Sequence, residues 1–182
     1  MINMLILASK SPRRQELLKY ITTDFTVKSA DVDETLPKGI SPSQAVIYLS
    51  SIKAEPFRND EDTVIGADTV VALGKTILGK PSDEDDARRM LKMLSGKTHS
   101  VFTGVTVIKG QVSDSFAVET KVKFYDLSDK EIDDYVKTGE PLDKAGAYGI
   151  QGYGSLLVEE IKGDYFNVVG LPVSKLNKIL NT

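Results

Sequence analysis

Short apolar runs that alternate with helix-start sequences constrain the fold of this chain more than any other feature. The apolar run 5–8 is followed by Ser11 and Pro12, a good N-cap residue with proline in the first helical turn. A serine before a proline recurs at Ser41, and Ser128 opens a capping-box sequence. This alternation of short strands and capped helices predicts a mixed α/β fold.

The expected elements follow from these signals in chain order. Strands are expected over 5–8, 25–29, 64–73, 100–109, 116–125, 156–161 and 166–169, and helices from about residues 11, 41, 82, 128 and 172. The segment GQVSD at 110–114 separates two strand-like runs, which predicts a β-hairpin. Four consecutive acidic residues at 83–86 suit a helix start, because the helix dipole favours negative charge there.

The composition excludes several kinds of site. The chain has no cysteine and one histidine, which excludes disulfides, thiolate nucleophiles and histidine-rich metal sites. A bound metal would be held by carboxylate oxygens, which indicates Mg²⁺ or Mn²⁺. The formal net charge of −3 argues against a dedicated binder of nucleic acid polymers. No secretory leader or membrane-length apolar run is seen, so we expect a cytoplasmic protein with no membrane partner.

Two adjacent arginines occupy an unfavourable place. Arg13 and Arg14 lie in the first turn of the helix expected from Ser11, where the dipole disfavours each cation by roughly 0.3–1 kcal/mol. Free N–H groups at a helix start bind anions, and guanidinium groups match phosphate oxygens, so a polyphosphate ligand would explain the pair. In the alternative, both arginines face solvent or pair with acids such as Asp31 or Glu34.

A carboxylate interrupts the most apolar segment, TVIGADTVVAL. Burying Asp68 within a strand is unfavourable unless a metal, a cation or hydrogen bonds satisfy it, which suggests a functional role. In the alternative, the strand ends at Gly66 and Asp68 caps a turn. Asp31, Asp33 and Glu34 follow another expected strand; they are either a solvated acidic loop or further oxygen ligands for a hard metal.

Two lysines and the histidine are ambiguous on their own. Lys80 lies in a Gly-Lys-Pro turn, and Lys53 lies late in the second expected helix. Each could reach a phosphate or could simply be solvated. His99 stands near a strand start, where we expect it to pack or form a hydrogen bond rather than to act in catalysis.

The segment DKAGAYGIQG carries three glycines at three-residue spacing. Gly146, Gly149 and Gly152 would let the backbone approach a ligand, although an ordinary glycine-rich loop explains them equally. The spacing matches neither the dinucleotide-binding nor the P-loop pattern. Gln151 could present its side-chain amide to the edge of a nucleobase.

Taken together, these stretches resemble the Maf family, which is named for a link to septum formation. The matching segments cover nearly the whole chain in order: SPRR at 11–14, DE at 33–34, ADT at 67–69, GKP at 79–81, SGKTH at 95–99, DKAGAYGIQG at 143–152 and VVGLP at 168–172. The resemblance implies one domain over 1–182 with a long mixed sheet flanked by helices and two lobes around a cleft. This fold is similar to that of the inosine triphosphate pyrophosphatases.

The resemblance also implies an activity and a set of residues. Maf proteins hydrolyse a nucleoside triphosphate to the monophosphate and diphosphate with a divalent metal, and they are often homodimers. The SPRR, ADT and IQG segments resemble the branch that takes dTTP and UTP rather than the one that takes 7-methyl-GTP. The implied catalytic residue is Asp68, with Glu34 and Asp68 on the metal. The implied substrate-binding residues are Ser11, Arg13, Arg14, Lys53, Thr69, Lys80 and Gln151.

Two alternatives stay open at this point. The substrate could be a modified pyrimidine or another nucleotide. The chain could also be a nucleotide-binding regulator of cell division without physiological turnover, because binding and catalysis use the same cations.

Overall fold

A computed structural model describes residues 3–182. Seven strands form one mixed sheet in the order β2-β1-β3-β5-β6-β7, with β4 paired to β3. The strands are β1 (Leu5–Ala8), β2 (Thr26–Lys28), β3 (Thr63–Leu73), β4 (Thr76–Leu78), β5 (Thr98–Lys109), β6 (Val112–Phe124) and β7 (Val158–Lys162). The α-helices are α1 (Pro12–Leu18), α2 (Pro42–Ala54), α3 (Glu84–Leu94), α4 (Asp129–Lys137), α5 (Tyr165–Val169) and α6 (Val173–Leu180). The 3-10 helices are η1 (Glu55–Phe57), η2 (Glu140–Asp143), η3 (Ala145–Ala147) and η4 (Gly152–Leu157).

The helix starts agree with the sequence signals. Ser11, Ser41 and Ser128 are the N-caps of α1, α2 and α4, and the last two form complete capping boxes. The helix expected from residue 82 is α3, whose N-cap is Asp83, and the side chain of Asp83 accepts a hydrogen bond from the Asp86 amide. Local hydrogen bonds therefore fix these four boundaries to within a residue.

The β5–β6 hairpin is confirmed, but its turn is shorter than predicted. Lys109 pairs with Val112, so only two residues form the turn, and Gly110 has a φ of 57°. The last three residues of GQVSD belong to β6, because they pair with β5 instead of looping out. Positive φ is why a glycine is favoured at the start of this turn.

One expectation about a short segment is wrong, and one short strand was not expected. The segment 166–169, expected as a strand, is the helix α5, and the side chain of Asp164 caps it through the amides of Phe166 and Asn167. A short apolar run does not distinguish a strand from a buried helix by periodicity. The strand β4 was not expected; it pairs with the end of β3 after a tight turn at Gly74, which has a φ of 60°.

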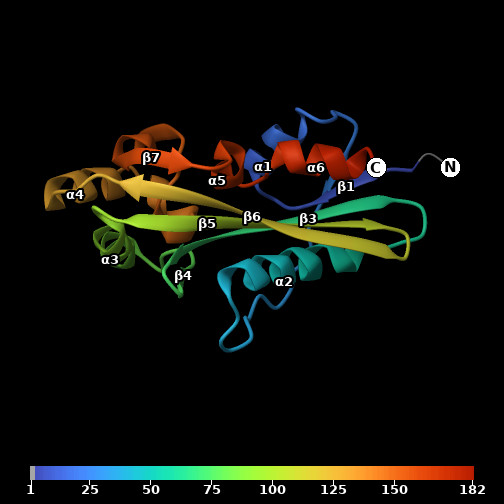
Figure 1. Ribbon diagram of the computed structural model, residues 1–182, viewed down its shortest axis with the longest axis horizontal. Coiled ribbons are helices and arrows are strands. Elements are labelled where there is room, and N and C mark those ends of the chain that lie inside the picture. Colours follow the sequence, from blue (N-terminus) through green and yellow to red (C-terminus); the bar gives the residue numbers. More distant parts are fainter. Residues whose placement is uncertain (1–2) are drawn as a thin grey trace.

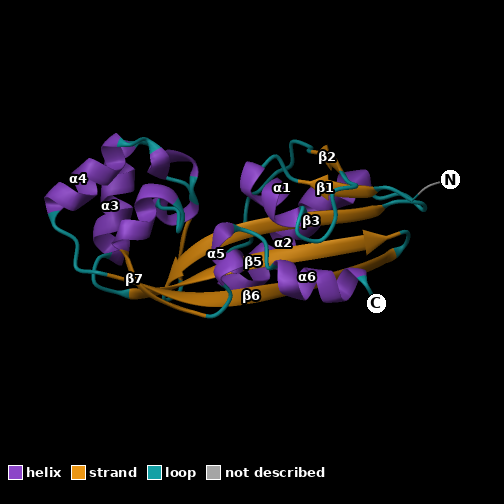
Figure 2. Cartoon of the chain, turned by 90° about the horizontal axis from the view of Figure 1, so that it is seen from above, coloured by secondary structure: helices purple, strands orange, loops and turns teal. Residues whose placement is uncertain are grey.

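The helices cover both faces of the sheet. Figure 1 shows α2 below the long strands and α1, α5 and α6 above them. Figure 2 shows α3 and α4 together beside β7 at one end, with the other helices towards the opposite end. Among residues 3–182, no helix has the length and apolar character required to span a bilayer.

The two largest apolar cores define two lobes that share three strands. In β3, Ile65 packs in the core under α1 and α6, whereas Val71 packs in the core of α3 and α4. In β5, Val105 belongs to the first core and Val101 to the second, and β6 likewise contributes to both. The predicted two-lobed mixed α/β architecture is thus confirmed, and the middle of β3 lies between the lobes.

Two glycines let α2 pack directly on the sheet. A Cβ atom on Gly104 would lie 2.2 Å from the carbonyl oxygen of Val46, and one on Gly66 would lie 2.2 Å from that of Ser50. The strand therefore does not end at Gly66; β3 continues beneath the helix. This close packing brings the side chain of Lys53, late in α2, to the middle of β3.

Candidate active site

A cleft of about 960 Å³ lies where the two lobes meet. Its walls come from the β1–α1 loop, the loop after β2, α2, the middle of β3 and the segment 143–151. Every residue that the sequence assigned to the site lines this cleft: Ser11, Arg13, Arg14, Glu34, Lys53, Asp68, Thr69, Lys80 and Gln151. Residues from distant parts of the chain thus converge, and their individual roles stay predictions.

Asp68 lies in the middle of β3 with little exposure to solvent. Its carboxylate accepts a hydrogen bond from the Lys53 ammonium group, which also lies 3.1 Å from Oε1 of Glu34. Lys53 and Asp68 are 19% and 12% exposed, so the pair is largely shielded from water, whereas Glu34 is exposed at the cleft. The burial of Asp68 is therefore compensated by a cation, one of the explanations that the sequence left open.

The two adjacent arginines have different environments. Arg14 ties the site together: its guanidinium donates to the Gly170 carbonyl at 2.8 Å, to Ser9 Oγ at 3.2 Å and to Thr69 Oγ1 at 3.1 Å. Burial lowers the pKa of Arg14 from its ordinary value, and the negative charge of Asp68 opposes that shift. Contacts within the protein thus occupy several of the five N–H donors of Arg14, which the sequence analysis expected to bind phosphate.

Arg13 is the freer arginine of the pair. Its side chain is 36% exposed, and its closest acid is Asp143 of the second lobe at 4.0 Å. Within residues 3–182, neither Asp31 nor Glu34 forms an ion pair with either arginine, so the alternative pairing expected from sequence is not observed. Arg13 can turn towards a ligand without losing a strong internal contact.

Two hydroxyl groups assigned to substrate binding already have partners in the protein. Oγ of Ser11 accepts a hydrogen bond from the Arg14 amide as the N-cap of α1. Oγ1 of Thr69 lies 2.8 Å from Oγ1 of Thr103, which donates to the Asn167 carbonyl at 2.9 Å. These contacts fix the cleft wall, so any substrate contact must share the hydroxyl groups with it.

Lys80 and Gln151 present exposed side chains to the cleft from its second-lobe side. Neither side chain forms a hydrogen bond or ion pair with another group in the described part of the chain. Both can therefore bind a ligand without breaking an internal contact.

The three spaced glycines make room for the protein itself. A Cβ on Gly146 would lie 2.8 Å from Val71, and one on Gly149 would lie 2.9 Å from the Lys144 side chain. A Cβ on Gly152 would lie 2.6 Å from Oε2 of Glu140. The sequence suggested that these glycines let the backbone approach a ligand, but in the structure each one makes room for a neighbouring side chain of the protein.

His99 is structural, as expected. It is 2% exposed, its Nε2 lies 2.7 Å from the Tyr148 hydroxyl, and its ring stacks edge-on against Phe124. Burial lowers the pKa of His99 to about 4. Because Tyr148 lines the cleft, this buried pair supports the wall from behind.

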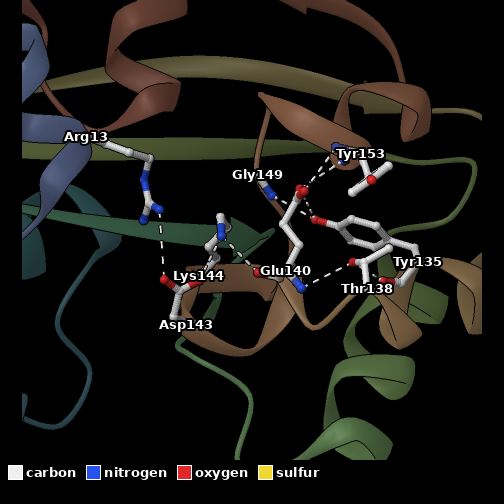
Figure 3. A network of polar contacts seen from close by, with 9 residues as sticks. Arg13, Tyr135, Thr138, Glu140, Asp143, Lys144, Gly149 and Tyr153 are labelled. Atoms are coloured by element: carbon white, nitrogen blue, oxygen red, sulfur yellow. Dashed lines mark hydrogen bonds and ion pairs between the residues drawn. The ribbon is translucent and has the colours of Figure 1, made fainter.

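Sequence reasoning missed a polar network in the second lobe. Figure 3 shows Arg13, Asp143, Lys144, Glu140 and Tyr135 joined by successive polar contacts. The segment DKAGAYGIQG is conspicuous for its glycines, whereas the network depends on its charged residues Asp143 and Lys144. The opposite charges of these two adjacent residues were the sequence signal that could have indicated the network.

The fold and cleft define a two-lobed α/β protein whose interlobe cleft carries a cluster of cations around a shielded carboxylate. The chain belongs to the Maf family, since the family model described as "Maf-like protein" matches residues 4–182.

Individual relatives agree with this membership. The chain is 48% identical over 183 residues to a dTTP/UTP pyrophosphatase of Bacillus pumilus (strain SAFR-032), covering 100% of this chain and 97% of that protein. It is 50% identical over 181 residues to a dTTP/UTP pyrophosphatase of Clostridioides difficile (strain 630), covering 97% and 93%. It also shares a fold with a HAM1 protein from Coxiella burnetii, at a TM-score of 0.57, 11% identity and 99% coverage of both chains.

Proposed function

We propose that this chain is a nucleotide pyrophosphatase that hydrolyses dTTP and UTP to the nucleoside monophosphate and diphosphate. The names of its relatives at 48% and 50% identity support this substrate class. The observation that carries the proposal is the shielded Asp68 carboxylate, which Lys53 holds at the centre of a cleft lined by further cations. A carboxylate beside a binding place for polyphosphate is the arrangement that hydrolysis of a phosphoanhydride needs.

The cations at the cleft suit a triphosphate. Arg13 and Lys80 are exposed enough to bind phosphate oxygens, and Arg14 can add N–H donors that its internal partners leave free. Diphosphate is the leaving group, so cations at its oxygens stabilise the charge that develops as the anhydride bond breaks. We therefore propose that phosphate binds between the start of α1 and the turn before α3.

Asp68 is the proposed base for the attacking water. Water forms a new bond to the α-phosphorus and gives a proton to the Asp68 carboxylate, while the α–β anhydride bond breaks and its electron pair leaves with diphosphate. Lys53 holds that carboxylate in one orientation from α2. Glu34 reaches the same ammonium group, so it can support the arrangement from the loop after β2.

The donor set at this point fits a divalent metal shared with the substrate. Glu34 and Asp68 offer two carboxylates, and no group of three or more metal-ligating side chains occurs within residues 3–182. Mg²⁺ is commonly held by one or two carboxylates together with substrate phosphates, so two suffice. We propose that these residues hold Mg²⁺ or Mn²⁺, which when bound would supply charge neutralisation for the phosphates.

Gln151 is the proposed reader of the base. Its amide can donate to O4 and accept from N3–H of uracil or thymine, whereas cytosine presents a donor and an unprotonated nitrogen at those positions. A mismatched edge leaves buried groups unpaired, at about 1–3 kcal/mol per group. The small apolar methyl group of thymine does not alter this edge, so one pocket can accept both dTTP and UTP.

We also propose that the chain acts as one domain over 1–182, as a homodimer in the cytoplasm, where free nucleoside triphosphates occur. The family resemblance supports the dimer, and the net charge of −3 supports small nucleotides rather than nucleic acid polymers as ligands. Sedimentation of the purified protein would test the dimer.

The test of the function measures diphosphate release from dTTP, UTP, CTP, dCTP, ATP, GTP and modified uridine triphosphates with Mg²⁺ or Mn²⁺. We expect dTTP and UTP to have the highest kcat/KM. Asp68→Asn keeps the shape of the side chain and should reduce turnover by at least about 10²-fold, the scale of a lost acid–base role. Asp114→Asn makes the same chemical change on an exposed residue of β6 and should leave turnover unchanged.

The outcomes separate the alternatives. Near-normal turnover in a folded Asp68→Asn variant would remove Asp68 from the chemistry. Faster use of a purine or a modified pyrimidine would replace the substrate assignment. Tight nucleotide binding without diphosphate release would favour a regulator of cell division over an enzyme.

A further inference from the structure

The side chain of Glu140 forms the centre of a hydrogen-bond cluster behind the cleft. Its Oε1 accepts from the Tyr135 hydroxyl at 2.9 Å and from the Gly154 amide at 3.0 Å. Its Oε2 accepts from the Tyr153 amide at 3.0 Å. The Tyr135 hydroxyl in turn accepts from the Gly149 amide at 3.1 Å (Figure 3). Three hydrogen bonds thus join the carboxylate and the phenol to a single loop, and a fourth joins the two side chains to each other.

These contacts hold the loop on both sides of Gln151. Gly149 lies before it, and Tyr153 and Gly154 lie after it, while Gln151 itself stays free to face the cleft. Neither Glu140 nor Tyr135 lines the cleft. The cluster therefore acts on the loop from outside the binding site.

The loop is shaped to fit this carboxylate. Gly152 has a φ of 67°, and a Cβ there would lie 2.6 Å from Oε2 of Glu140. A Cβ on Gly154 would lie 2.8 Å from the Tyr135 hydroxyl and 2.0 Å from the Gly149 carbonyl. A side chain at Gly152 or Gly154 would displace the hydrogen-bond cluster, so the geometry of the cluster depends on glycine at both positions.

The Glu140 carboxylate is balanced by hydrogen-bond donors rather than by a cation. Within residues 3–182, no lysine or arginine forms an ion pair with it, and Lys144 donates to its backbone carbonyl at 2.9 Å instead. The Tyr135 hydroxyl is protonated at neutral pH and can donate, and burial raises its pKa further. Hydrogen bonds from N–H and O–H groups to a charged acceptor are stronger than neutral ones, which suits a rigid support.

We infer that Glu140 is a positioning residue that, with Tyr135, fixes the Gln151 loop and thereby sets the discrimination between pyrimidine bases. The inference rests on the proposed function, in which Gln151 reads the base edge. A recognition group must be held near its productive geometry by packed and hydrogen-bonded neighbours to discriminate. The cations assigned to phosphate do not depend on this carboxylate, whose hydrogen-bond partners within residues 3–182 are Tyr135, Tyr153 and Gly154.

Glu140→Gln tests the inference with a nearly isosteric change. One carboxylate oxygen becomes an NH₂ group, which faces N–H or O–H donors on either side and cannot accept from them. We expect the ratio of kcat/KM for dTTP to that for CTP to fall by about tenfold or more, a loss equivalent to one good hydrogen bond. The kcat for saturating dTTP should stay within about threefold of the wild-type value, because the phosphate contacts are intact.

A matched control and a second variant keep the test decisive. Glu131→Gln makes the same chemical change in the capping box of α4, where the carboxylate contacts Ser128 and not the loop, and should leave the ratio unchanged. Tyr135→Phe removes the other member of the pair and should lower the ratio in the same direction. If Glu140→Gln does not fold, Tyr135→Phe carries the test.

A double-mutant cycle separates positioning from general structural damage. Glu140→Gln should have no further effect on the dTTP/CTP ratio in a Gln151→Ala background, since the group being positioned is gone. An unchanged ratio in folded Glu140→Gln, or an equal loss of kcat for every nucleotide, would overturn the inference. A wild-type protein that hydrolyses no pyrimidine triphosphate would instead overturn the proposed function.

Discussion

Lowering the pH should destabilise this protein through its one histidine. His99 is 2% exposed, and its Nδ1 has no hydrogen-bond partner. Its other ring nitrogen faces the hydroxyl of Tyr148, and the ring of Phe124 covers its side. Burial holds its pKa at about 4 in the folded protein. The unfolded chain has an ordinary histidine pKa of about 6.5.

The sign of the effect follows from these two pKa values. Above pH 6.5 both states are neutral, and the contribution to stability is fully present. Between pH 6.5 and 4 the unfolded chain takes up a proton that the folded protein does not, so the free energy of unfolding falls with pH. The gap corresponds to about 3 kcal/mol in total, most of which is lost by pH 4.5.

Urea unfolding of the wild type and His99→Gln at pH 7.5 and pH 4.5 measures this contribution. Glutamine does not titrate and can place a nitrogen near the position of Nε2, so the variant should lose about 2–3 kcal/mol less than the wild type between the two pH values. The subtraction removes the common contribution of the carboxylates. Equal losses in both proteins would refute the reasoning, because they would mean that His99 becomes protonated in the folded state without penalty.

Two further predictions concern the cleft and its supports. Arg13→Ala should lower kcat/KM for dTTP by about tenfold or more, as expected for a lost charge-assisted hydrogen bond. Its melting temperature should not change, because the ion pair of Arg13 is long and exposed. Normal kinetics with a lower melting temperature would show that Arg13 has a structural role instead. Gly104→Ala should destabilise the protein by about 1–3 kcal/mol and reduce turnover, because its Cβ would displace α2 and with it Lys53. Gly79→Ala, whose Cβ meets no atom within 4 Å, is the stability control, and equal melting temperatures would contradict the packing argument.

The predictable part of the fold is the part that local chemistry determines. Ser11, Ser41 and Ser128 satisfy amide groups within three residues of themselves, so the sequence alone locates those helix starts. The failures at 166–169 and at β4 concern short segments whose state depends on distant partners. The helix α5 is supported by Thr103 and Thr120, which lie on strands far away in the sequence.

The sequence predicted which residues line the cleft, but it did not predict which of them contact one another. Asp68 is conspicuous because a carboxylate in an apolar strand is locally anomalous. Its partner Lys53 lies on another element, and Arg14 reaches the Gly170 carbonyl across 156 residues of sequence. Glu140 resembles any acid in a polar loop until the structure shows the donors around it. Pairings of this kind depend on tertiary geometry, which no local pattern contains.

The sharing of β3, β5 and β6 between the lobes has a mechanical consequence. Proteins whose lobes are joined by linkers open by rotation about a few hinge residues. Here the lobes are halves of the same strands, and Asp68 pairs with Gly104 where those halves meet. Widening the cleft must therefore twist or bend a continuous hydrogen-bonded sheet, and the elasticity of the sheet opposes that deformation. The resting width of the cleft is consequently a property of the sheet, and neither lobe can be excised without cutting the strands that carry its core.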